Sequence, residues 1–296
     1  IENCFLQEDF IRPTTLDLGK LTVVANTHEQ YTEEVLSRIN TQVVGNRQFK
    51  ILIGCENLQV FTILKNILDM LNCKTVIVMG HVNDFAEQVS VTKSDLGIQL
   101  DRSAQEFKLF TEEGQLLRED EMVVLQTLVG LKDFGTVPIP VTAPTIIEEI
   151  TNALKLPSVK TKTRTRSLLE VGKRSSVQVY YDGLYTLASV LEYLALEETS
   201  LKRVINSLPK VHTTTDFVAC PPEAKGRVMR RLIKETRGQQ VELVDGVKVR
   251  SEDSWALILP DQEKALFKLI TQGTSSSKTE ELRNIYKGKI ARYQEQ

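Results

Sequence analysis

A short polar loop between two apolar stretches is the first place where side chains suited to chemistry lie close together. The stretch SDLGIQLDRSAQEFKLFTEEGQLL, residues 94–117, predicts a buried strand, a tight polar loop and a second strand with its turn. The loop carries the carboxylates Asp101 and Glu106. Because clustered carboxylates are ligands for hard divalent cations, the loop is either an ordinary connection or the remains of a metal site.

A cationic helix is the second candidate. The segment EAKGRVMRRLIKE, residues 223–235, places five cations within ten positions, while Val228, Leu232 and Ile233 supply an apolar side. Cations spaced three and four residues apart share one helix face, which can hold an anion. The alternative is a solvated face balanced by neighbouring acids. The candidate anion-binding residues are Arg227, Arg230, Arg231 and Lys234.

Other catalytic motifs are lacking in the sequence. The turn GCENLQ, residues 54–59, has one glycine where a dinucleotide fingerprint needs three. The histidines have no Ser, Cys or acidic partner at a recognisable spacing, so we expect surface or satisfied polar roles for His28, His81 and His212. The cysteines form no CxxC pair, which argues against disulfides and zinc. We expect buried free thiols at Cys4, Cys55, Cys73 and Cys220.

The composition describes the molecule that must position these residues. A chain of 296 residues and 33.4 kDa is long enough for two or three compact units. With 37 Lys+Arg, 39 Asp+Glu and 41% hydrophobic residues, it is typical of a globular protein without bulk attraction to nucleic acid. Its longest apolar runs are shorter than the roughly 20 residues of a membrane span, and its first residues do not resemble a signal peptide. We expect a cytoplasmic protein with no membrane partner.

Hydrophobic spacing predicts α/β structure in the first two thirds of the chain. Val35, Ile39 and Val43 lie at helical spacing, and residues 49–79 then predict strand, amphipathic helix and strand. Such a βαβ unit implies a parallel sheet. A strand at 136–141 followed by a helix starting near Pro144 predicts a second unit.

The pattern changes from about residue 211. One helix, three short strands (VELVDGVKV, SWALILP and ALFKLITQG) and a closing helix from about Ser277 predict an α+β unit with an antiparallel sheet. We expect a hinge near Pro209 and a buried Trp255 in the last unit.

Four segments in this order resemble successive landmarks of the α-D-phosphohexomutases, the phosphomannomutase and phosphoglucomutase superfamily. They are FKILIGCENLQVFTILKNILDMLNCKTVIV, SDLGIQLDRSAQEFKLFTEEGQLL, DGLYTLASVLEYLA and WALILPDQEKALFKLITQG. The resemblance implies a fold of two related three-layer α/β/α domains plus a C-terminal α+β domain. It divides the chain into a linker at 1–20 from an absent first domain, domain II at 21–102, domain III at 103–210 and domain IV at 211–296.

Two further segments resemble one branch of that superfamily. IENCFLQEDFIRP and CPPEAKGRVMRRLIKE are similar to the mutase-like C-terminal half of fusions with a sugar-1-phosphate nucleotidyltransferase, the mannose-1-phosphate guanylyltransferase. The resemblance implies an upstream nucleotidyltransferase domain, a role in carbohydrate metabolism and assembly as a homo-oligomer through the parent chain.

The resemblance also implies that the metal loop is a remnant. Mutases bind Mg²⁺ at a D-G-D-x-D-R loop, and residues 101–106 stand at the matching positions. Asp101 is the surviving carboxylate, while Ser103 and Gln105 replace the other two and Arg102 adds a positive charge. We therefore expect no Mg²⁺ site and no other cofactor in this segment.

The remaining mutase sites depart from the family in the same way. The phosphate loop R-P-S-G-T-E-P is matched by residues 259–265, LPDQEKA, which contain two acids. The sugar-selecting loop G-E-x-S-G-H is replaced within LLEVGKRSSVQVYYDG, residues 168–183, and the phosphoserine belongs to the absent first domain. No catalytic residue is assigned.

Three functions stay open. The first is a non-catalytic mutase-like module, a pseudoenzyme with a structural or regulatory role that binds a phosphorylated sugar or sugar nucleotide. The second is an enzyme of altered phosphosugar mutase mechanism, active with the rest of its polypeptide. The third is an anion-binding scaffold in which the cationic helix contacts RNA, an acidic protein or a phosphorylated ligand. A helix facing the cleft favours a small ligand, and a helix facing outward favours a macromolecule.

Overall fold

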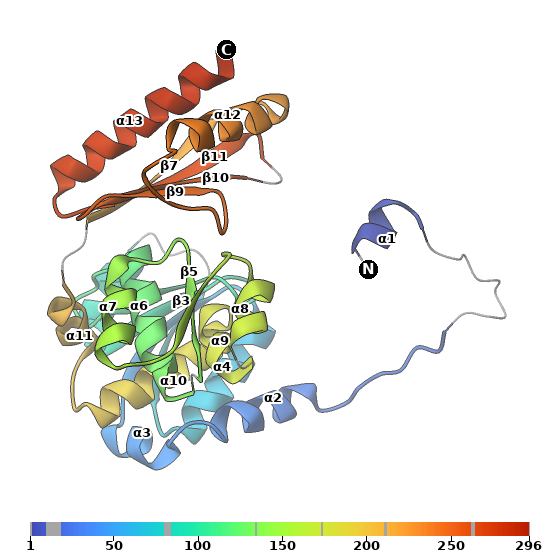
Figure 1. Ribbon diagram of the computed structural model, residues 1–296. Helices are drawn as coiled ribbons and strands as arrows, with labels where there is room; N and C mark the ends of the chain where they lie inside the picture. Colours follow the sequence, from blue (N-terminus) through green and yellow to red (C-terminus); the bar gives the residue numbers. More distant parts are fainter. Residues whose placement is uncertain are drawn as a thin grey trace.

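The computed structural model describes residues 2–9, 19–79, 84–133, 135–172, 174–209, 212–261 and 264–295. Within these ranges the strands form three sheets, of four, two and five strands (Figure 1). The mixed α/β class that the sequence predicts is confirmed. The first and second sheets lie together below the C-terminal sheet in Figure 1.

The first sheet is built on the predicted βαβ unit. Its strand order is β2-β1-β3-β4, and β1 pairs in parallel with both β2 and β3. Helix α4 makes the crossover between β1 and β2, and its Leu64, Ile67 and Leu68 are buried against the sheet. The elements are β1 (Lys50–Cys55), α4 (Leu58–Met70), β2 (Lys74–Met79), α5 (Phe85–Val91), β3 (Leu96–Leu100) and β4 (Phe107–Thr111).

Strand β4 runs antiparallel to β3, with Leu96 opposite Thr111 and Leu100 opposite Phe107. The connecting loop, residues 101–106, is too short for the crossover that a parallel pair requires, so the chain must reverse direction. β4 thus completes the first sheet although it lies beyond residue 102, where we expected the next domain to begin. The division at residues 20, 102 and 210 stays a prediction.

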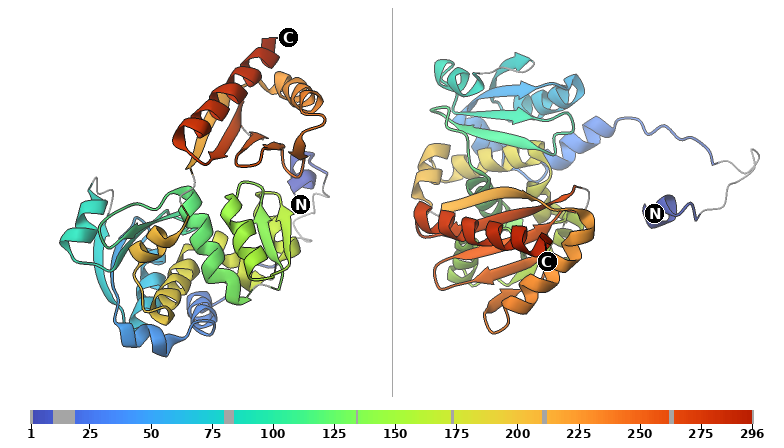
Figure 2. Two further views of the ribbon diagram at one scale, coloured as in Figure 1. Left: turned by 60° about the vertical axis from the view of Figure 1, so that its left-hand side comes forward. Right: turned by 90° about the horizontal axis from the view of Figure 1, so that it is seen from above.

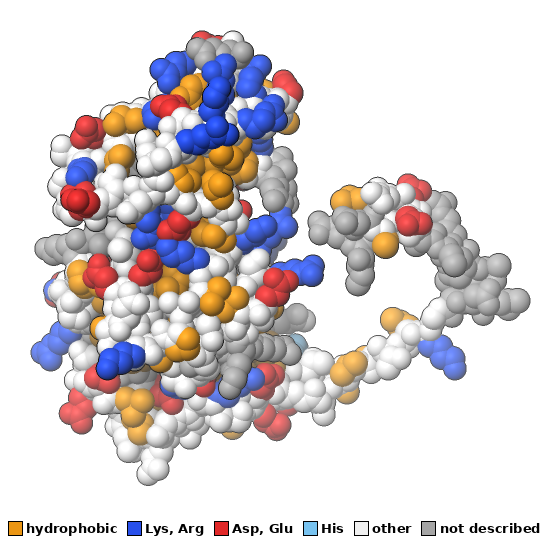
Figure 3. Space-filling model, in the orientation of Figure 1, with side chains coloured by type: hydrophobic (Ala, Val, Ile, Leu, Met, Phe, Trp, Pro, Cys, Tyr) orange, Lys and Arg blue, Asp and Glu red, His pale blue; other side chains and the backbone are white. Residues whose placement is uncertain are grey.

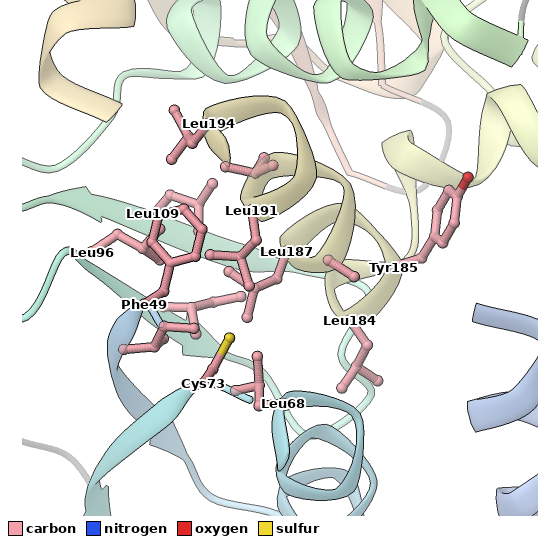
Figure 4. Packing of buried hydrophobic residues seen from close by; sticks show 14 of the residues in the cluster. Phe49, Leu68, Cys73, Leu96, Leu109, Leu184, Tyr185, Leu187, Leu191 and Leu194 are labelled. Atoms are coloured by element: carbon pink, nitrogen blue, oxygen red, sulfur yellow. The ribbon is translucent and has the colours of Figure 1, made fainter. Parts of the chain in front are cut away.

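One large core joins the first sheet to helix α10 (Gly183–Leu196). Figure 4 shows Leu187, Leu191 and Leu194 of α10 pointing at Leu96 and Leu109 of the sheet. Gly183 starts the helix where a Cβ would lie 2.9 Å from the carbonyl oxygen of Ala104, so the helix end fits closely against the 101–106 loop. The core therefore connects the loop to a helix that lies about 80 residues later in the chain.

The N-terminal helical stretch consists of two helices rather than one. Helix α2 (Thr27–Leu36) ends before Ser37, and α3 (Thr41–Arg47) begins after Asn40, whose side chain accepts a hydrogen bond from the backbone of Val43. An asparagine that caps a new helix competes with continuation of the old one. Val35 and Ile39 are buried as their spacing predicts.

The second sheet contains β5 (Val137–Pro140) and β6 (Ser158–Thr161), paired in parallel. Val137 and Val141 direct their backbone N–H groups to Pro157 and Thr161, on the β6 side. Pro138 and Pro140 stand at the alternate positions and have no N–H, so the opposite edge of β5 lacks donors for a further strand. The second sheet is therefore smaller than the first in the part of the chain that the structure describes.

The helices between β4 and β7, apart from α10, pack on this small sheet or on the core of the first sheet. They are α6 (Glu119–Gly130), α7 (Thr145–Ala153), α8 (Thr165–Val171), α9 (Arg174–Val177) and α11 (Leu201–Ser207), with the short 3-10 helices η2 (Leu131–Asp133) and η3 (Gln178–Tyr180). α1 (Glu2–Leu6) is the only other helix described before α2.

The C-terminal sheet has the strand order β7-β11-β10-β9-β8 and is antiparallel throughout. The predicted antiparallel α+β unit is confirmed, with two differences from the expected strands. VELVDGVKV folds as a two-strand hairpin, and His212–Ala219 adds the edge strand β7, whose threonines are typical of strands. The elements are β7 (His212–Ala219), α12 (Pro222–Glu235), β8 (Gln240–Glu242), β9 (Val247–Arg250), β10 (Trp255–Pro260), β11 (Leu266–Gly273) and α13 (Ser276–Glu295).

Several smaller expectations have clear outcomes. Trp255 is 2% exposed, as predicted. All four cysteines are free, but Cys4 is exposed, because it lies in α1 outside the cores, whereas the other three are buried. No described helix has the length and apolar character needed to cross a membrane.

Candidate functional site

A cavity of about 1240 Å³ lies between the first sheet and the C-terminal sheet. One wall consists of the ends of β1 and β3, the 101–106 loop and the start of α6. The facing wall is the inner face of β7 and β11, and the segment before α7 closes one side. The lining residues that the argument uses are Asp101, Arg102, Lys108, Arg118, Thr213 and Lys268.

The strand register defines the inner face of the C-terminal sheet. Opposed residues on antiparallel strands have side chains on one face, so the pairs Thr213–Gln272, Thr215–Ile270 and Phe217–Lys268 form three successive rows. Thr213, Thr215, Lys268 and Ile270 line the cavity. The next residues along each strand point to the outer face, where Phe267 and Leu269 pack under α12 and α13.

The 101–106 loop uses the carboxylate of Asp101 internally. Oδ2 accepts hydrogen bonds from the hydroxyl and the backbone N–H of Ser103, the latter over 3.1 Å, and Oδ1 accepts one from the backbone N–H of Glu106 over 3.1 Å. Partial burial acts to raise the pKa of Asp101, but these hydrogen bonds outweigh it and lower the pKa.

These residues do not fit a magnesium ion. Mg²⁺ requires oxygen ligands in near-octahedral geometry, and here one carboxylate is already committed to the loop backbone. Neighbouring Arg102 adds positive charge and pairs with Glu56 at 3.3 Å. Among the described residues, no group of three or more His, Cys, Asp or Glu side chains is arranged to hold a metal ion.

The charges of the cavity separate into paired and unpaired groups. Arg118 pairs with Asp120 at 3.2 Å and with Glu121 at 3.3 Å, and Arg102 pairs with Glu56. Lys108 and Lys268 form no ion pair within the described ranges, and they come from opposite walls. The Thr213 hydroxyl is buried and forms no hydrogen bond with any described residue. The cavity therefore offers two free ammonium groups to a ligand, and it has one buried lining hydroxyl without a described partner.

Sequence reasoning missed Lys108, Lys268, Thr213 and Thr215. The sequence of β11, LFKLITQG, does indicate the lysine. Successive side chains of a strand point to opposite faces of the sheet, so Lys268 and Ile270 must face the side opposite Phe267 and Leu269. Strand β7 was not predicted from the sequence. Its pairing with β11 brings Thr213 and Thr215 beside this lysine.

The described residues of the two other loops matched to mutase sites do not line the cavity. The described part of residues 168–183 is mostly helical, and none of it lies on the cavity wall. At the phosphate-loop position, the Nζ of Lys225 donates to the carbonyl oxygens of Asp261 and Lys264, the latter at 2.6 Å. Gln262 and Glu263 lie outside the described residues. Lys225, one of the five cations of the helix, therefore binds the backbone at this position.

Helix α12 lies on the outer face of the C-terminal sheet, remote from the cavity (Figures 1 and 2). Val228 and Leu232 are fully buried against the sheet, as the amphipathic pattern predicts, but Ile233, which was expected on the same side, is exposed. The four candidate cations are exposed, and Figure 3 shows Lys and Arg side chains gathered over α12 and the neighbouring end of α13. Arg227 donates to the backbone of Gln294. The exposed set, called the α12 cations below, is Arg227, Arg230, Arg231 and Lys234.

The histidines remain apart from the cavity lining as far as it is described. His28 is exposed on α2, and half-buried His212 begins β7, where its carbonyl oxygen accepts from Thr279. His81 lies outside the described residues.

The fold, with α/β structure on one side of the cavity and a C-terminal α+β unit on the other, is similar to that of solved phosphohexomutases. The chain is a homologue of the α-D-phosphohexomutases. It is 24% identical to the probable phosphoglucosamine mutase of Methanopyrus kandleri over 86% of this chain, and 22% identical to a phosphoglucomutase/phosphomannomutase of Thermococcus kodakarensis over 95%. No protein-family model matches the sequence.

Solved structures give the same fold. A phosphoglucomutase/phosphomannomutase family protein of Burkholderia thailandensis superposes with a TM-score of 0.71 at 16% identity over 90% of this chain. Aspergillus fumigatus N-acetylphosphoglucosamine mutase, solved with GlcNAc-6P and magnesium, gives a TM-score of 0.60 at 14% identity over 95% of this chain. The chain spans 63% of the Methanopyrus relative, 69% of the Thermococcus relative, and 64% and 68% of the two solved chains.

Proposed function

We propose that this chain is a phosphohexomutase-like module that binds a phosphorylated sugar or sugar nucleotide in the cavity without isomerising it. In this proposal it is the C-terminal part of a longer sugar-1-phosphate nucleotidyltransferase of the mannose-1-phosphate type, where it has a structural or regulatory role. It retains the binding cleft of a mutase and lacks the metal chemistry.

The state of Asp101 carries this proposal. A metal-dependent mutase needs a free carboxylate cluster on the cavity wall, and the one carboxylate left at the three matched metal positions, Asp101, is held by Ser103 and the backbone of Glu106. Phosphoryl transfer depends mainly on positioning and charge neutralisation by such ions. Loss of the cluster therefore removes catalysis while leaving the cavity in place.

The lining of the cavity supports a phosphorylated sugar as ligand. Lys108 and Lys268 are free cations for phosphate oxygens, and the exposed carboxylates of Glu106 and Glu119 can accept hydrogen bonds from sugar hydroxyls. The volume of about 1240 Å³ also admits a sugar nucleotide. The Aspergillus relative was solved with a sugar phosphate, and we carry that ligand class, but not its magnesium, over to this chain.

The larger polypeptide is inferred from the sequence resemblance alone. The chain spans 63% of its Methanopyrus relative. A homo-oligomer assembled through the parent chain fits a structural role of this module. Nucleotide sequence upstream of Ile1 tests this part: a glycine-rich nucleotidyltransferase loop there supports the fusion, and a complete mutase first domain with its phosphoserine contradicts it.

The binding proposal is tested by calorimetry and by a mutase assay. Mannose 1-phosphate and GDP-mannose are titrated into the protein with and without Mg²⁺, and the chain is assayed for interconversion of mannose 1-phosphate and mannose 6-phosphate. We expect micromolar to millimolar binding that does not depend on Mg²⁺, and no interconversion. Lys268→Ala removes a charge-assisted hydrogen bond of about 1.5–3 kcal/mol, so affinity falls about tenfold or more.

The matched control is Lys234→Ala, which removes an exposed lysine from the opposite face of the C-terminal sheet. It leaves affinity unchanged if the ligand lies in the cavity. Equal losses in both variants contradict the cavity site. Interconversion by the isolated chain overturns the non-catalytic role and favours the alternative, an enzyme of altered mechanism.

The outward position of α12 favours a second candidate function, a scaffold that binds an acidic protein segment. The α12 cations lie within about 10 Å along one helix face, since an α-helix rises 1.5 Å per residue, and their guanidinium groups match carboxylates bidentately. This short face, on a chain with a formal charge of -2, lacks the extent of a nucleic-acid site.

The test is binding of a polyglutamate peptide at low salt. We expect weak, salt-sensitive binding that the double variant Arg227→Ala/Arg230→Ala abolishes and that Lys268→Ala preserves. Equal binding by the double variant and the unchanged protein would show that the α12 cations form a solvated face and not a binding site. Preferential binding of single-stranded RNA over the peptide also contradicts this candidate.

A further inference from the structure

The C-terminal unit, residues 212–295, contacts the rest of the protein mainly on one side of the cavity. The contacts join residues 141–163, around the second sheet and α7, to residues 242–272 of the C-terminal sheet. Thr145 is central: its hydroxyl accepts hydrogen bonds from Trp255 at 3.2 Å and Gln272 at 3.0 Å, and its backbone N–H donates to Gln272 at 3.2 Å. Thr163 donates to Asp245 at the edge of the contact.

Lys248 lies inside this contact and is 2% exposed. Its Nζ donates to the carbonyl oxygen of Val141 at 2.7 Å and lies 3.8 Å from the centre of the Trp255 ring. Val141 directly follows β5 of the second sheet, and Trp255 lies in β10 of the C-terminal sheet. The amine therefore bridges the two units, and it can be hydrated only if they separate.

Charged groups from four elements surround Lys248. Glu148 comes from α7, Lys160 from β6, Glu242 from β8 and Arg250 from β9. Arg250 pairs with both carboxylates, and Lys160 pairs with Glu242 and lies 3.5 Å from Glu148. Without Lys248 the group contains two cations and two carboxylates and is neutral. Protonated Lys248 adds an excess positive charge that no carboxylate of the group compensates.

We propose that these five residues form an interdomain latch, in which the charge on Lys248 controls how tightly the C-terminal unit docks and hence how wide the cavity opens. The latch consists of Glu148, Lys160, Glu242, Lys248 and Arg250. It regulates access to the cavity whatever ligand the cavity takes, so it does not depend on the proposed function.

The direction of the effect follows from burial. Desolvation, together with the charge of Arg250, lowers the pKa of Lys248 from its ordinary value of 10.5 to about 7 in the docked state. The open state, in which the amine is hydrated, therefore binds more protons between these two values. Docking strengthens as the pH rises through this window, by up to about tenfold for each pH unit, and reaches its lower plateau below pH 7.

A second titration acts only in acid. Burial acts to raise the pKa of Glu148, but the hydrogen bond and charge of Arg250 outweigh it and lower the pKa. A carboxyl group with a lowered pKa stabilises the docked state above its ordinary value and loses that contribution as the pH falls through the lowered one. Above pH 7 the titration of Glu148 therefore does not contribute, and the pH dependence of docking there reports the charge on Lys248.

Trp255 is the single tryptophan of the chain and lies against Lys248 of the latch, so its fluorescence reports docking. Acrylamide quenching is measured from pH 6 to pH 9.5, with far-UV circular dichroism to check that the fold is intact. We expect the quenching constant of the unchanged protein to be flat below pH 7 and to fall above it, because the open fraction decreases.

Two substitutions move the profile in opposite directions. Lys248→Met removes the charge and keeps the length, so quenching is low and independent of pH. Lys248→Arg keeps a charge that does not titrate in this range, so quenching stays high. Lys234→Met, on the outer face, is the matched control and retains the profile of the unchanged protein. A flat profile in the unchanged protein, or the same slope in Lys248→Met, overturns the latch.

Discussion

The two faces of the C-terminal sheet carry cations in opposite ways. On the outer face, α12 shields the sheet with Val228 and Leu232 and exposes four cations to solvent. On the inner face, the sheet itself carries Lys248, Arg250 and Lys268, which lie in the interdomain contact or line the cavity. The outer cations are conspicuous in the sequence, whereas the inner ones are separated by apolar residues.

The difference shows that local density of charge is a poor guide to where charge is used. A run of cations on a helix can remain solvated at little cost in free energy. A lysine or arginine in a buried strand must find partners, because an unpaired charge in the interior is expensive. Isolated cations in apolar strands are therefore stronger pointers to contacts and sites than a basic helix.

The largest expected contrast lies in the apolar groups of the two faces. Phe267, on the outer face, is fully buried, whereas Phe217, on the inner face, is 60% exposed. Phe267→Ala should lower the free energy of unfolding by about 3–5 kcal/mol, and Phe217→Ala by no more than about 0.5 kcal/mol. Urea denaturation of both variants measures this; equal losses would show that the inner face is covered in solution.

A smaller contrast separates the buried and exposed arginines. Arg250→Met leaves Lys160 as the remaining ion-pair partner of Glu148 and Glu242, so we expect a loss of about 2 kcal/mol, between the values typical of exposed and fully buried pairs. Arg230→Met on α12 should change stability by less than about 0.5 kcal/mol. If thermal unfolding gives the reverse order, the interdomain ion pairs do not form.

The opposite wall of the cavity provides a third test. Asp101→Ala removes the acceptor of three hydrogen bonds in the exposed 101–106 loop, which should cost about 1 kcal/mol. The lowered pKa of Asp101 means that this contribution is present above the ordinary carboxyl pKa and disappears as the pH falls through the lowered value. Urea denaturation of both proteins measures this as a function of pH. A difference in the free energy of unfolding between Asp101→Ala and the unchanged protein that persists at pH 2 would contradict this role of the Asp101 carboxylate.

The smallest expected effect is that of magnesium. Because the Asp101 oxygens are occupied within the loop, millimolar Mg²⁺ should leave the melting temperature unchanged within error in differential scanning fluorimetry. Ca²⁺ at the same concentration is the control for general ionic effects. A shift specific to Mg²⁺ and abolished by Asp101→Ala would restore the metal site.

The sequence predicted the elements that carry a strong period. The βαβ unit at 49–79, the burial of Trp255 and the amphipathic α12 are all confirmed. The edge strand β7 was missed because its sequence, HTTTDFVA at His212–Ala219, has no apolar period and becomes a strand only through pairing with β11. The end of α2 was missed because a capping asparagine outweighed the helical spacing of Val35 and Ile39.

The site was predictable only in part. Placement of the 101–106 loop at a strand end follows from the sequence, and it does line the cavity. The cavity lysines could not be assigned, since Lys108 and Lys268 are 160 residues apart and meet through the docking of two sheets. The outward direction of α12 likewise depends on which face of the sheet the helix covers.

The prolines of β5 bear on how the chain avoids association while it folds. A strand edge with free N–H groups is a template for another chain, and a small sheet with a single partner strand is the most exposed to this hazard. Pro138 and Pro140 remove the donors from the unpaired edge of β5, so a strand from a second molecule cannot continue the ladder there. The same two residues that keep the second sheet small thus protect it against edge-to-edge aggregation.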